Sequence, residues 1–168
     1  MQKVGAADVL AYFRTISAIP RGSGNEARIS EWVEDFGKAL GFPTIRDRHN
    51  NVVIFKAGQN GGESAAPLIL QAHCDMVCDM RDTASHDFSK DPIRVIERDG
   101  WVSADGTTLG ADNGLGVAFI CMALANKSLR HPPIEAVVTA GEEIGMVGMG
   151  AFDASCLGAK RMINLDAE

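Results

Sequence analysis

Two helices are predicted at the beginning of the chain, where apolar residues recur every three or four positions among polar ones. The first covers residues 6–19 and stops before Pro20, which cannot continue a helix. The second ends at Gly41, and Ser23 or Asn25 is its expected N-cap. Both are amphipathic, so each should cover one face of a larger structure. The apolar positions are Val9, Leu10, Phe13, Ile16 and Ile19 in the first helix and Ile29, Trp32, Val33, Phe36 and Leu40 in the second.

Strand patterns dominate from residue 43 onward. The continuous apolar run that opens residues 68–77 predicts a strand buried on both faces, and residues 133–140 and 161–166 predict two further buried strands. Two hairpins are also predicted, because Asn, Asp and Gly residues interrupt the strand pattern at two places. The hairpin strands are residues 43–48 with 51–57 and residues 92–97 with 101–104.

The remaining segments connect these strands. Residues 58–66 are polar and rich in glycine, which is typical of a surface loop. Residues 115–125 are apolar nearly all round and predict a buried helix, and a short helix is expected before the last strand. The alternation of helices with buried strands indicates an α/β fold, a three-layer sandwich around a mixed, mostly parallel sheet. In such folds ligands bind beyond the carboxyl ends of the strands.

Composition narrows the possible functions. The 168 residues suffice for one domain, and a net charge of −6 without any run of Lys or Arg argues against a nucleic-acid partner. No apolar stretch approaches the ~20 residues of a membrane span, and the first residues lack a signal-peptide pattern. The cysteines are too few and too irregular for a disulfide framework. We interpret Cys74, Cys78, Cys121 and Cys156 as reduced, mostly buried thiols of a cytoplasmic protein.

Polar residues follow three of the predicted buried strands, at positions that a core would reject. They are His73-Cys74-Asp75, Gly141-Glu142-Glu143 and Asp166-Ala167-Glu168, and a further acid, Asp112, lies just before the apolar helix. Burying an isolated carboxylate is costly unless a cation or hydrogen-bond donors compensate. Several acids at one sheet edge therefore predict a metal site. An imidazole with carboxylates suits zinc, with manganese or cobalt as alternatives.

Spacing indicates different tasks within this cluster. Residues i and i+2 of a strand point to the same side, so Asp75 can brace His73 while Cys74 faces away. Glu142 and Glu143 are adjacent and therefore diverge. One of them can bind metal while the other carries protons, which is the division of labour that metal-assisted hydrolysis needs.

Each feature also has an ordinary structural interpretation. Asp112 would serve equally as a helix N-cap, and Asp166 as a loop acid. The H-x-D pair alone is a weak signal, and only the combination of acids at strand and helix ends is specific. The other histidines, His49, His86 and His131, are interpreted as structural or exposed residues.

The glycines of GMVGMG follow a predicted strand and raise the alternative of a phosphate-binding turn. Their order does not match G-x-G-x-x-G, and the two preceding glutamates would repel a pyrophosphate. The sequence contains neither G-x-x-x-x-G-K-[ST] nor the G-x-S-x-G of serine hydrolases. Nucleotide binding and serine hydrolysis are therefore disfavoured.

Five segments resemble the aminoacyl-histidine dipeptidases of the co-catalytic zinc peptidase clan: AHCDMV, SHDFSKDPI, GTTLGADNG, GEEIGMVG and INLDAE. The resemblance begins at SAIPRGSGNE and spans essentially the whole chain. It implies a catalytic domain that binds two zinc ions and hydrolyses small peptides, dipeptides of the Xaa-His type. It also implies that full-length relatives are homodimers.

The same resemblance implies a set of zinc ligands. His73, Asp112 and Asp166 would bind the first zinc ion. Asp112 would bridge to the second, which also takes Glu143.

The resemblance also implies catalytic roles for two further residues. Glu142 would be the general base for a zinc-activated water, and Asp75 would orient His73.

The chain departs from the family pattern in one respect. The family's second zinc takes a histidine far downstream, and the sequence ends at Glu168. The family's remaining catalytic strands and its lid or dimerisation domain are likewise not in these 168 residues. We therefore expect a truncated chain that binds at most one divalent ion with useful affinity, has little or no peptidase activity alone and exposes an unpaired strand edge.

Two alternatives to a dipeptidase fragment stay open. One is a non-catalytic metal-binding or assembly fragment that a partner chain completes. The other is a related tripeptidase or N-acyl amino-acid deacylase, since such enzymes share the H-x-D pair and the paired glutamates.

Overall fold

The computed structural model describes residues 5–166, so Ala167 and Glu168, expected after the last strand, lie outside the described residues. The two predicted N-terminal helices are confirmed as α1 (Ala6–Ser17) and α2 (Ala27–Ala39). The expected cap of α2 is wrong, because Glu26 occupies the N-cap position. The apolar helix is also confirmed as α3 (Ala111–Ala125), which begins four residues earlier than the apolar pattern.

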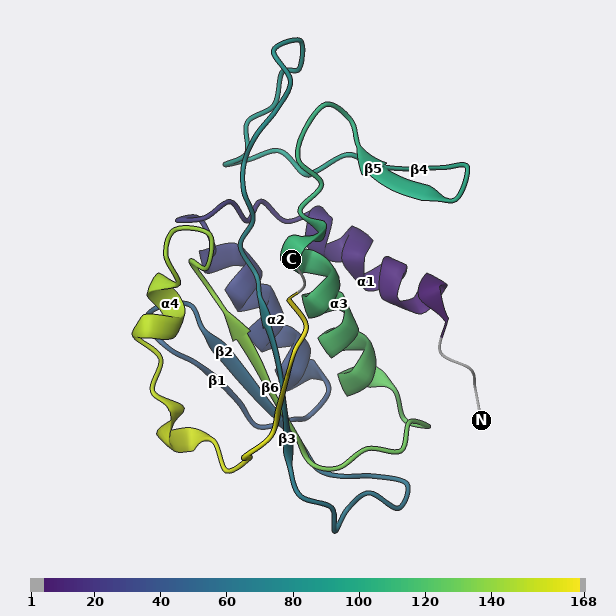
Figure 1. Cartoon of the computed structure of the whole chain (residues 1–168), viewed down its shortest axis with the longest axis vertical. Helices are drawn as coiled ribbons and strands as arrows, with labels where there is room; N and C mark the ends of the chain where they lie inside the picture. Colours follow the sequence, from purple (N-terminus) through teal and green to yellow (C-terminus); the bar gives the residue numbers. More distant parts are fainter. Residues whose placement is uncertain (1–4, 167–168) are drawn as a thin grey trace.

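Five strands form a mixed sheet in the order β1-β2-β6-β3-β7 (Figure 1). The strands β1, β6, β3 and β7 run in one direction, and β2 runs against them. The predicted α/β fold with a mixed, mostly parallel sheet is thus confirmed. The bounds are β1 (Thr44–Arg46), β2 (Val52–Lys56), β3 (Leu68–His73), β6 (Ile134–Thr139) and β7 (Met162–Asn164).

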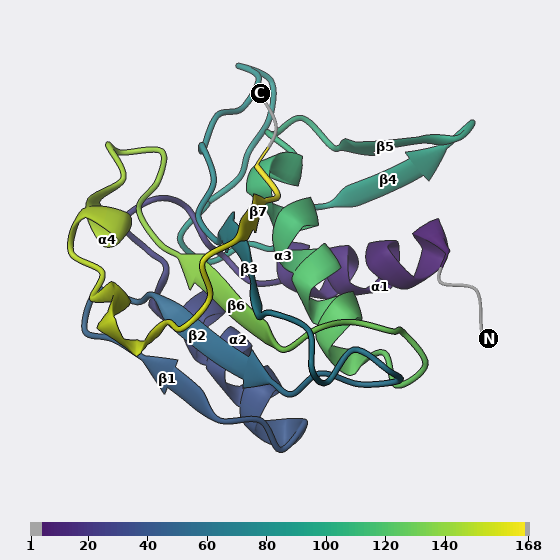
Figure 2. The ribbon, with the colours of Figure 1, turned by 60° about the horizontal axis from the view of Figure 1, so that its bottom comes forward.

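The main core lies between the sheet and the three longer helices. Successive side chains of a strand point to opposite faces, and alternate residues of β2, β6 and β3 meet the helices. Helix α2 packs on β1 and β2, whereas α3 packs on β3 and is covered in turn by α1 (Figure 2). The central apolar residues from the sheet are Val52, Ile54, Ala72, Ile134, Ala136 and Val138.

A shorter segment covers part of the opposite face of the sheet. It contains α4 (Val147–Gly150), the short helix expected from the sequence, and the 3-10 helix η1 (Ala154–Cys156). The Asn51 amide donates to the Gly148 carbonyl, and the buried Glu135 carboxylate accepts from the backbone N–H groups of Gly158 and Ala159. These contacts hold the segment against the sheet as a third layer.

The predicted second hairpin forms a separate two-stranded sheet, with β4 (Val95–Arg98) antiparallel to β5 (Trp101–Ala104). Asp99 and Gly100 at its turn both have positive φ, as the tight turn of a two-residue hairpin loop requires. This hairpin lies apart from the five-stranded sheet in both ribbon views (Figures 1 and 2).

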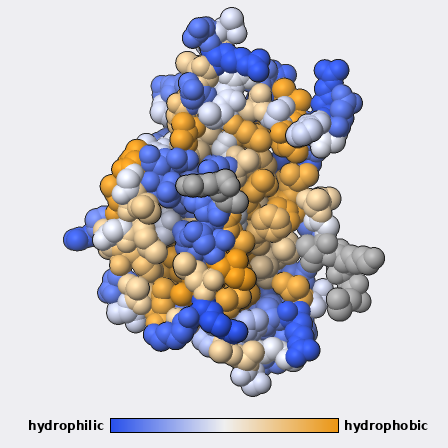
Figure 3. All heavy atoms as spheres, in the orientation of Figure 1, coloured by the Kyte–Doolittle hydropathy of each residue, from blue (hydrophilic) through white to orange (hydrophobic). Residues whose placement is uncertain are grey.

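Two strands are less buried than their sequences predict. Residues 68–71 of β3 are only partly buried, and all three residues of β7 are exposed. The physical reason is position: β7 is an edge strand, and among residues 5–166 no element pairs with its outer side. The space-filling view shows further apolar surface over α3 (Figure 3), where Phe119 is 45% exposed.

An exposed edge strand favours pairing with a second copy of the chain. We expect Ile163→Lys to lower concentration-dependent self-association at least several-fold, because it places a charge on β7, where Ile163 is 48% exposed. Sedimentation velocity at several protein concentrations measures the effect. Val147→Lys is the matched control, since Val147 is a similarly exposed apolar residue in α4, away from any strand edge. Equal effects of the two variants would contradict an edge mechanism.

All four cysteines are free, but only two of them match the expected burial. Cys74 and Cys121 are buried, whereas Cys78, in the loop after β3, and Cys156, the last residue of η1, are exposed. Among the helices of residues 5–166, none combines the length and apolar character needed to span a lipid bilayer.

Candidate metal centre

The candidate site lies where three parallel strands end together. His73 is the last residue of β3 and is 1% exposed. Glu142 and Glu143 follow β6, and Asp166 follows β7, so parallel pairing brings these residues to one edge of the sheet. Because the strands are held in register by backbone hydrogen bonds, the positions of these side chains depend on the whole sheet.

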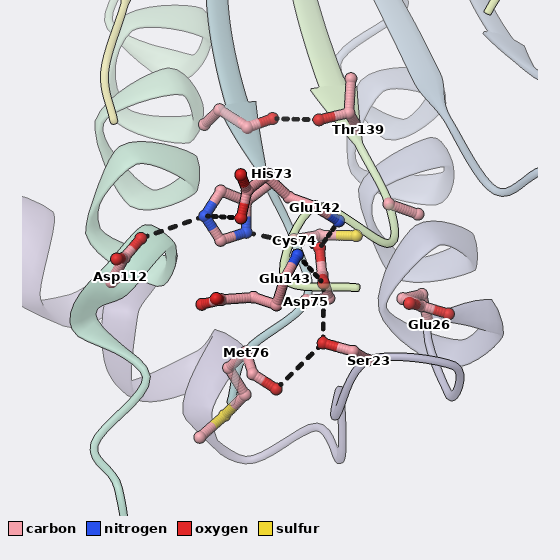
Figure 4. A network of polar contacts seen from close by, with 12 residues as sticks. Ser23, Glu26, His73, Cys74, Asp75, Met76, Asp112, Thr139, Glu142 and Glu143 are labelled. Atoms are coloured by element: carbon pink, nitrogen blue, oxygen red, sulfur yellow. Dashed lines mark hydrogen bonds and ion pairs between the residues drawn. The ribbon is translucent and has the colours of Figure 1, made fainter. Parts of the chain in front are cut away.

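The imidazole of His73 is surrounded by carboxylates from separate segments (Figure 4). Its Nε2 lies 3.0 Å from Asp112 Oδ1, 3.7 Å from Asp166 Oδ2 and 3.8 Å from Glu142 Oε2. Ligand atoms of His73, Asp112 and Glu143 all lie within 4.8 Å of one another. The Nε2 atom therefore faces three carboxylates, and that of Glu143 lies close by.

Asp75 lies behind the imidazole and is fully buried. Its Oδ1 is 3.3 Å from His73 Nδ1, a contact longer than an ideal hydrogen bond. The carboxylate also accepts from the backbone N–H groups of Glu142 and Glu143 and from the hydroxyl of Ser23, at 3.0, 3.2 and 2.8 Å. Asp75 therefore connects His73 to the loop that carries both glutamates.

The turn after β6 makes this connection possible. Gly141 has φ +63°, a left-handed conformation that is costly for residues with a side chain. The turn points the next two backbone N–H groups at Asp75 and leaves the side chains of Glu142 and Glu143 free to reach the site (Figure 4).

The electrostatics of the cluster follow from its burial and charge. Burial alone raises the pKa of Asp75, but its hydrogen bonds, first that with His73, outweigh burial and lower the pKa to about 2. Burial alone lowers the pKa of His73, but Asp75, Asp166 and Asp112 together raise it to about 9. The pKa of Glu143 is raised by burial and by its acidic neighbours, against the effect of His73.

The donor set fits a divalent cation. Five carboxylates and one imidazole leave the cluster with excess negative charge, which a divalent ion would compensate. Ligand atoms around one tetrahedral zinc ion stand roughly 3.3 Å apart, because each bond is about 2.0–2.2 Å long. The distances around His73 Nε2 are close to this spacing, so small side-chain movements suffice to bind an ion.

Asp112 enters the site from the first turn of α3 rather than capping that helix. Gly110 occupies the N-cap position, and no side-chain capping bond is present there. Asp112 and Asn113 have non-helical backbone angles, and the peptide bond between them is cis. The alternative role of Asp112 as an N-cap is therefore wrong, because its carboxylate turns toward His73 instead.

Two residues of the segment between α1 and α2 also contact the site, although the sequence pattern did not predict a role for them there. Ser23, considered above as a helix cap, donates to Asp75. Arg21 is buried and donates to the backbone carbonyls of Cys74 and Asp75, next to His73. The available signal was the polar run RGSGNE between two amphipathic helices, which contains more polar residues than a cap requires.

The other histidines lie elsewhere in the structure. His49 is in the β1–β2 turn, where it accepts a hydrogen bond from Arg48. His86 stacks edge-on against Phe88, and the Nδ1 atom of His131 is 2.6 Å from the carbonyl oxygen of Pro132. Within residues 5–166, only His73 belongs to a group that could hold a metal ion.

Replacing Asp75 tests whether it holds His73 in place. We expect Asp75→Asn to weaken zinc affinity ~10–100-fold, the loss typical when the partner that orients a metal-binding histidine is removed. Competition with a chromophoric chelator measures the dissociation constant. Asp47→Asn is the matched control, since Asp47 likewise accepts two backbone N–H bonds, from His49 and Asn51, but in the β1–β2 turn. An unchanged zinc affinity in Asp75→Asn would show that Asp75 does not orient His73 for metal binding.

A cleft of about 390 Å³ opens beside the acidic cluster. Asp112 and Asp166 lie at its polar end, and Leu115, Phe119 and Leu165 line its apolar side. The site is thus open to a small molecule that carries both polar and apolar groups.

Comparison with known proteins identifies similar sequences and structures. Residues 69–168 match peptidase family M20/M25/M40. The cytosol non-specific dipeptidase of Escherichia coli is 40% identical over 156 residues, which are 93% of this chain and 32% of that protein. The aminoacylhistidine dipeptidase of Vibrio alginolyticus superposes with a TM-score of 0.94 at 37% identity, over 99% of this chain and 34% of that one.

A tripeptidase from Staphylococcus aureus is less similar, with a TM-score of 0.81 and 25% identity over 98% of this chain and 44% of that one. The chain spans about a third of the length of the two dipeptidases.

Proposed function

Because the chain belongs to peptidase family M20/M25/M40, we propose that it carries the metal-binding part of a zinc-dependent dipeptidase active site. His73, Asp112 and Asp166 would hold one zinc ion. Asp112 and Glu143 would be the residues of this chain available to a second ion. The observation that carries this proposal is the approach of acids from α3 and from the ends of β6 and β7 to a single buried imidazole nitrogen.

Bound zinc would polarise the scissile carbonyl and lower the pKa of a bound water. Among the residues of the chain, Glu142 is the proposed proton carrier. Its carboxylate lies 3.8 Å from His73 Nε2, farther than that of Asp112 at 3.0 Å, so it is not the nearest ligand candidate. Glu142 accepts a proton from the attacking water and delivers it to the leaving amine, as the new C–O bond forms and the C–N bond breaks. The backbone N–H of Glu142 donates to Asp75, which holds the main chain of this residue beside the site.

Asp75 and His73 have positioning roles in this mechanism. The Asp75 carboxylate faces Nδ1, which directs Nε2 toward the acids. Asp75 also holds the backbone of Glu142 and Glu143, so one buried side chain sets both the imidazole and the glutamate loop.

The proposed substrate is a dipeptide, with Xaa-His among the preferred types, cleaved in the cytoplasm. The support comes from the names of the two most similar proteins described above, which are both dipeptidases, one of them called cytosolic. The tripeptidase shares less sequence and superposes less closely, which favours the dipeptidase branch.

The described residues supply a fuller set of ligands for the first ion than for the second. Three proposed ligands meet at the first zinc, but the second has only Asp112 and Glu143, and no further histidine of residues 5–166 reaches it. We therefore propose that the 168-residue chain binds one ion tightly and hydrolyses dipeptides weakly by itself.

The test combines metal binding with activity. Isothermal titration of the chain with zinc should give one tight site. A chimera in which this chain replaces the matching third of the Escherichia coli dipeptidase should cleave Xaa-His and other dipeptides faster than tripeptides or N-acyl amino acids. Absence of zinc binding would contradict the proposal. A chimera that prefers tripeptides would instead favour a tripeptidase over a dipeptidase.

A further inference from the structure

Arg21 is a buried cation beside the site. It is 1% exposed and lies in the segment between α1 and α2. Arg21 Nη1 donates to the carbonyl oxygens of Cys74 and Asp75, at 3.0 and 3.1 Å, and Nη2 donates to the carbonyl oxygen of Gly110. All three acceptors are backbone atoms, so the contacts depend on the shape of two loops rather than on side-chain identity.

The two loops that Arg21 joins are those that carry His73 and Asp112. Cys74 and Asp75 directly follow His73 at the end of β3. Gly110 precedes Asp112 by two residues at the beginning of α3. One planar guanidinium, with its donors in a fixed geometry, therefore spans the two segments whose side chains meet at 3.0 Å.

The residues around the Arg21 guanidinium leave a space that fits it. Gly110 has φ +66°, and a Cβ at that position would collide with Arg21 Nη2 and Met76 Sδ. A Cβ on Gly114 would lie 2.6 Å from Nη2 and 3.0 Å from the Phe13 ring. Two glycines of α3 and its N-cap thus make room for the guanidinium.

Packing alone does not account for a cation at this position. Burial lowers the pKa of Arg21 to about 10, against the charges of nearby acids, Asp75 and Asp112 among them, so the group stays protonated at neutral pH. A buried charge is costly, and an apolar side chain of similar size would fill the same volume without that cost. The guanidinium instead supplies hydrogen bonds that fix the two loops.

We propose that Arg21 is a positioning residue that sets the separation of His73 and Asp112 and so tunes metal affinity. The inference rests on the metal site proposed above. The hydrogen bonds of Arg21 go to backbone carbonyls, so it acts through the main chain of the segments that present the proposed ligands.

A pair of buried cations provides the test. Lys56 is 6% exposed and donates to the carbonyl oxygens of Ala123 and Asn126, at the opposite end of α3 from the site. Arg21→Met and Lys56→Met each remove a buried cation and its hydrogen bonds to carbonyl oxygens. Both should lower the free energy of unfolding, measured in urea without metal.

Only Arg21→Met should change the metal site. We expect its zinc dissociation constant, measured by chelator competition on the 168-residue chain, to rise ~10–100-fold, the range found when groups that orient metal ligands are lost. Lys56→Met should change it less than about twofold, because sites that share no partners behave independently. The visible absorption of the cobalt-loaded chain should shift in Arg21→Met alone.

Arg21→Lys keeps the charge but not the planar geometry, so its zinc affinity should lie between those of the wild type and Arg21→Met. If Arg21→Met does not fold, the comparison of Arg21→Lys with the wild type tests the inference. Equal zinc affinity and equal cobalt spectra in the wild type and both Arg21 variants would overturn the inference while leaving the metal site intact. Failure of the wild-type chain to bind zinc would instead overturn the proposed function and the inference with it.

Discussion

Replacing His73 with alanine is expected to weaken zinc binding by more than the ~10–100-fold that follows loss of a partner that only orients a metal ligand. His73 supplies the single nitrogen at which the carboxylates meet, and no other histidine of the described residues reaches this position. Without the imidazole, the remaining acids repel one another and hold an ion less selectively. Isothermal titration with zinc measures the loss.

A matched variant separates this effect from a general loss of stability. His49→Ala removes an exposed imidazole from the β1–β2 turn, where its contact is with Arg48. It should leave the zinc dissociation constant unchanged. Comparable losses in the two variants would show that the site is not centred on His73.

Glu142→Gln is expected to lower kcat ~10²–10⁴-fold in the active chimera, the range associated with a positioned acid–base group. The amide cannot accept the proton of water, but it matches the size of the carboxylate and leaves the backbone bond from Glu142 to Asp75 in place. Zinc affinity should therefore change by less than about threefold, since the neighbouring proposed ligands stay. Initial rates on a dipeptide, with the zinc dissociation constant measured in parallel, distinguish catalysis from binding.

The control for Glu142 is another glutamate with backbone hydrogen bonds. Glu135 is buried on the face of the sheet covered by α4 and η1, where it accepts from Gly158 and Ala159. Glu135→Gln should lower stability without the large fall in kcat. A Glu142→Gln chimera that retains wild-type kcat would exclude Glu142 as the general base.

Much of the fold could be predicted from local pattern. The spacing of Phe13 and Ile16 predicts α1, and the apolar run before His73 predicts β3, because burial of apolar surface governs both elements. The burial of β7 was not predictable in the same way. Its residues are as apolar as those of β3, but exposure depends on which strands end at the edge of the sheet, and that is a property of topology.

Some residues of the candidate site could likewise be predicted from local sequence, and others only from the fold. His73, Glu142 and Asp166 stand out in the sequence because acids and imidazoles directly after apolar strands are unusual. Arg21 and Ser23 do not stand out, because an arginine and a serine between two helices resemble ordinary loop residues. Their contacts with the loop after β3 arise only when segments more than 50 residues apart come together.

The order of the strands also has a consequence for how the protein is made. β6 pairs with β2 on one side and with β3 on the other, although both precede it in the chain. Roughly 60 residues separate β3 from β6, so at about 5–20 residues per second the ribosome takes roughly 3–12 s to supply the central strand. During that interval β2 and β3 both have open edges, which are prone to pairing with other strands. Because Asp166 follows β7, the complete cluster around His73 can assemble only after all three strands that end at the site have been synthesised.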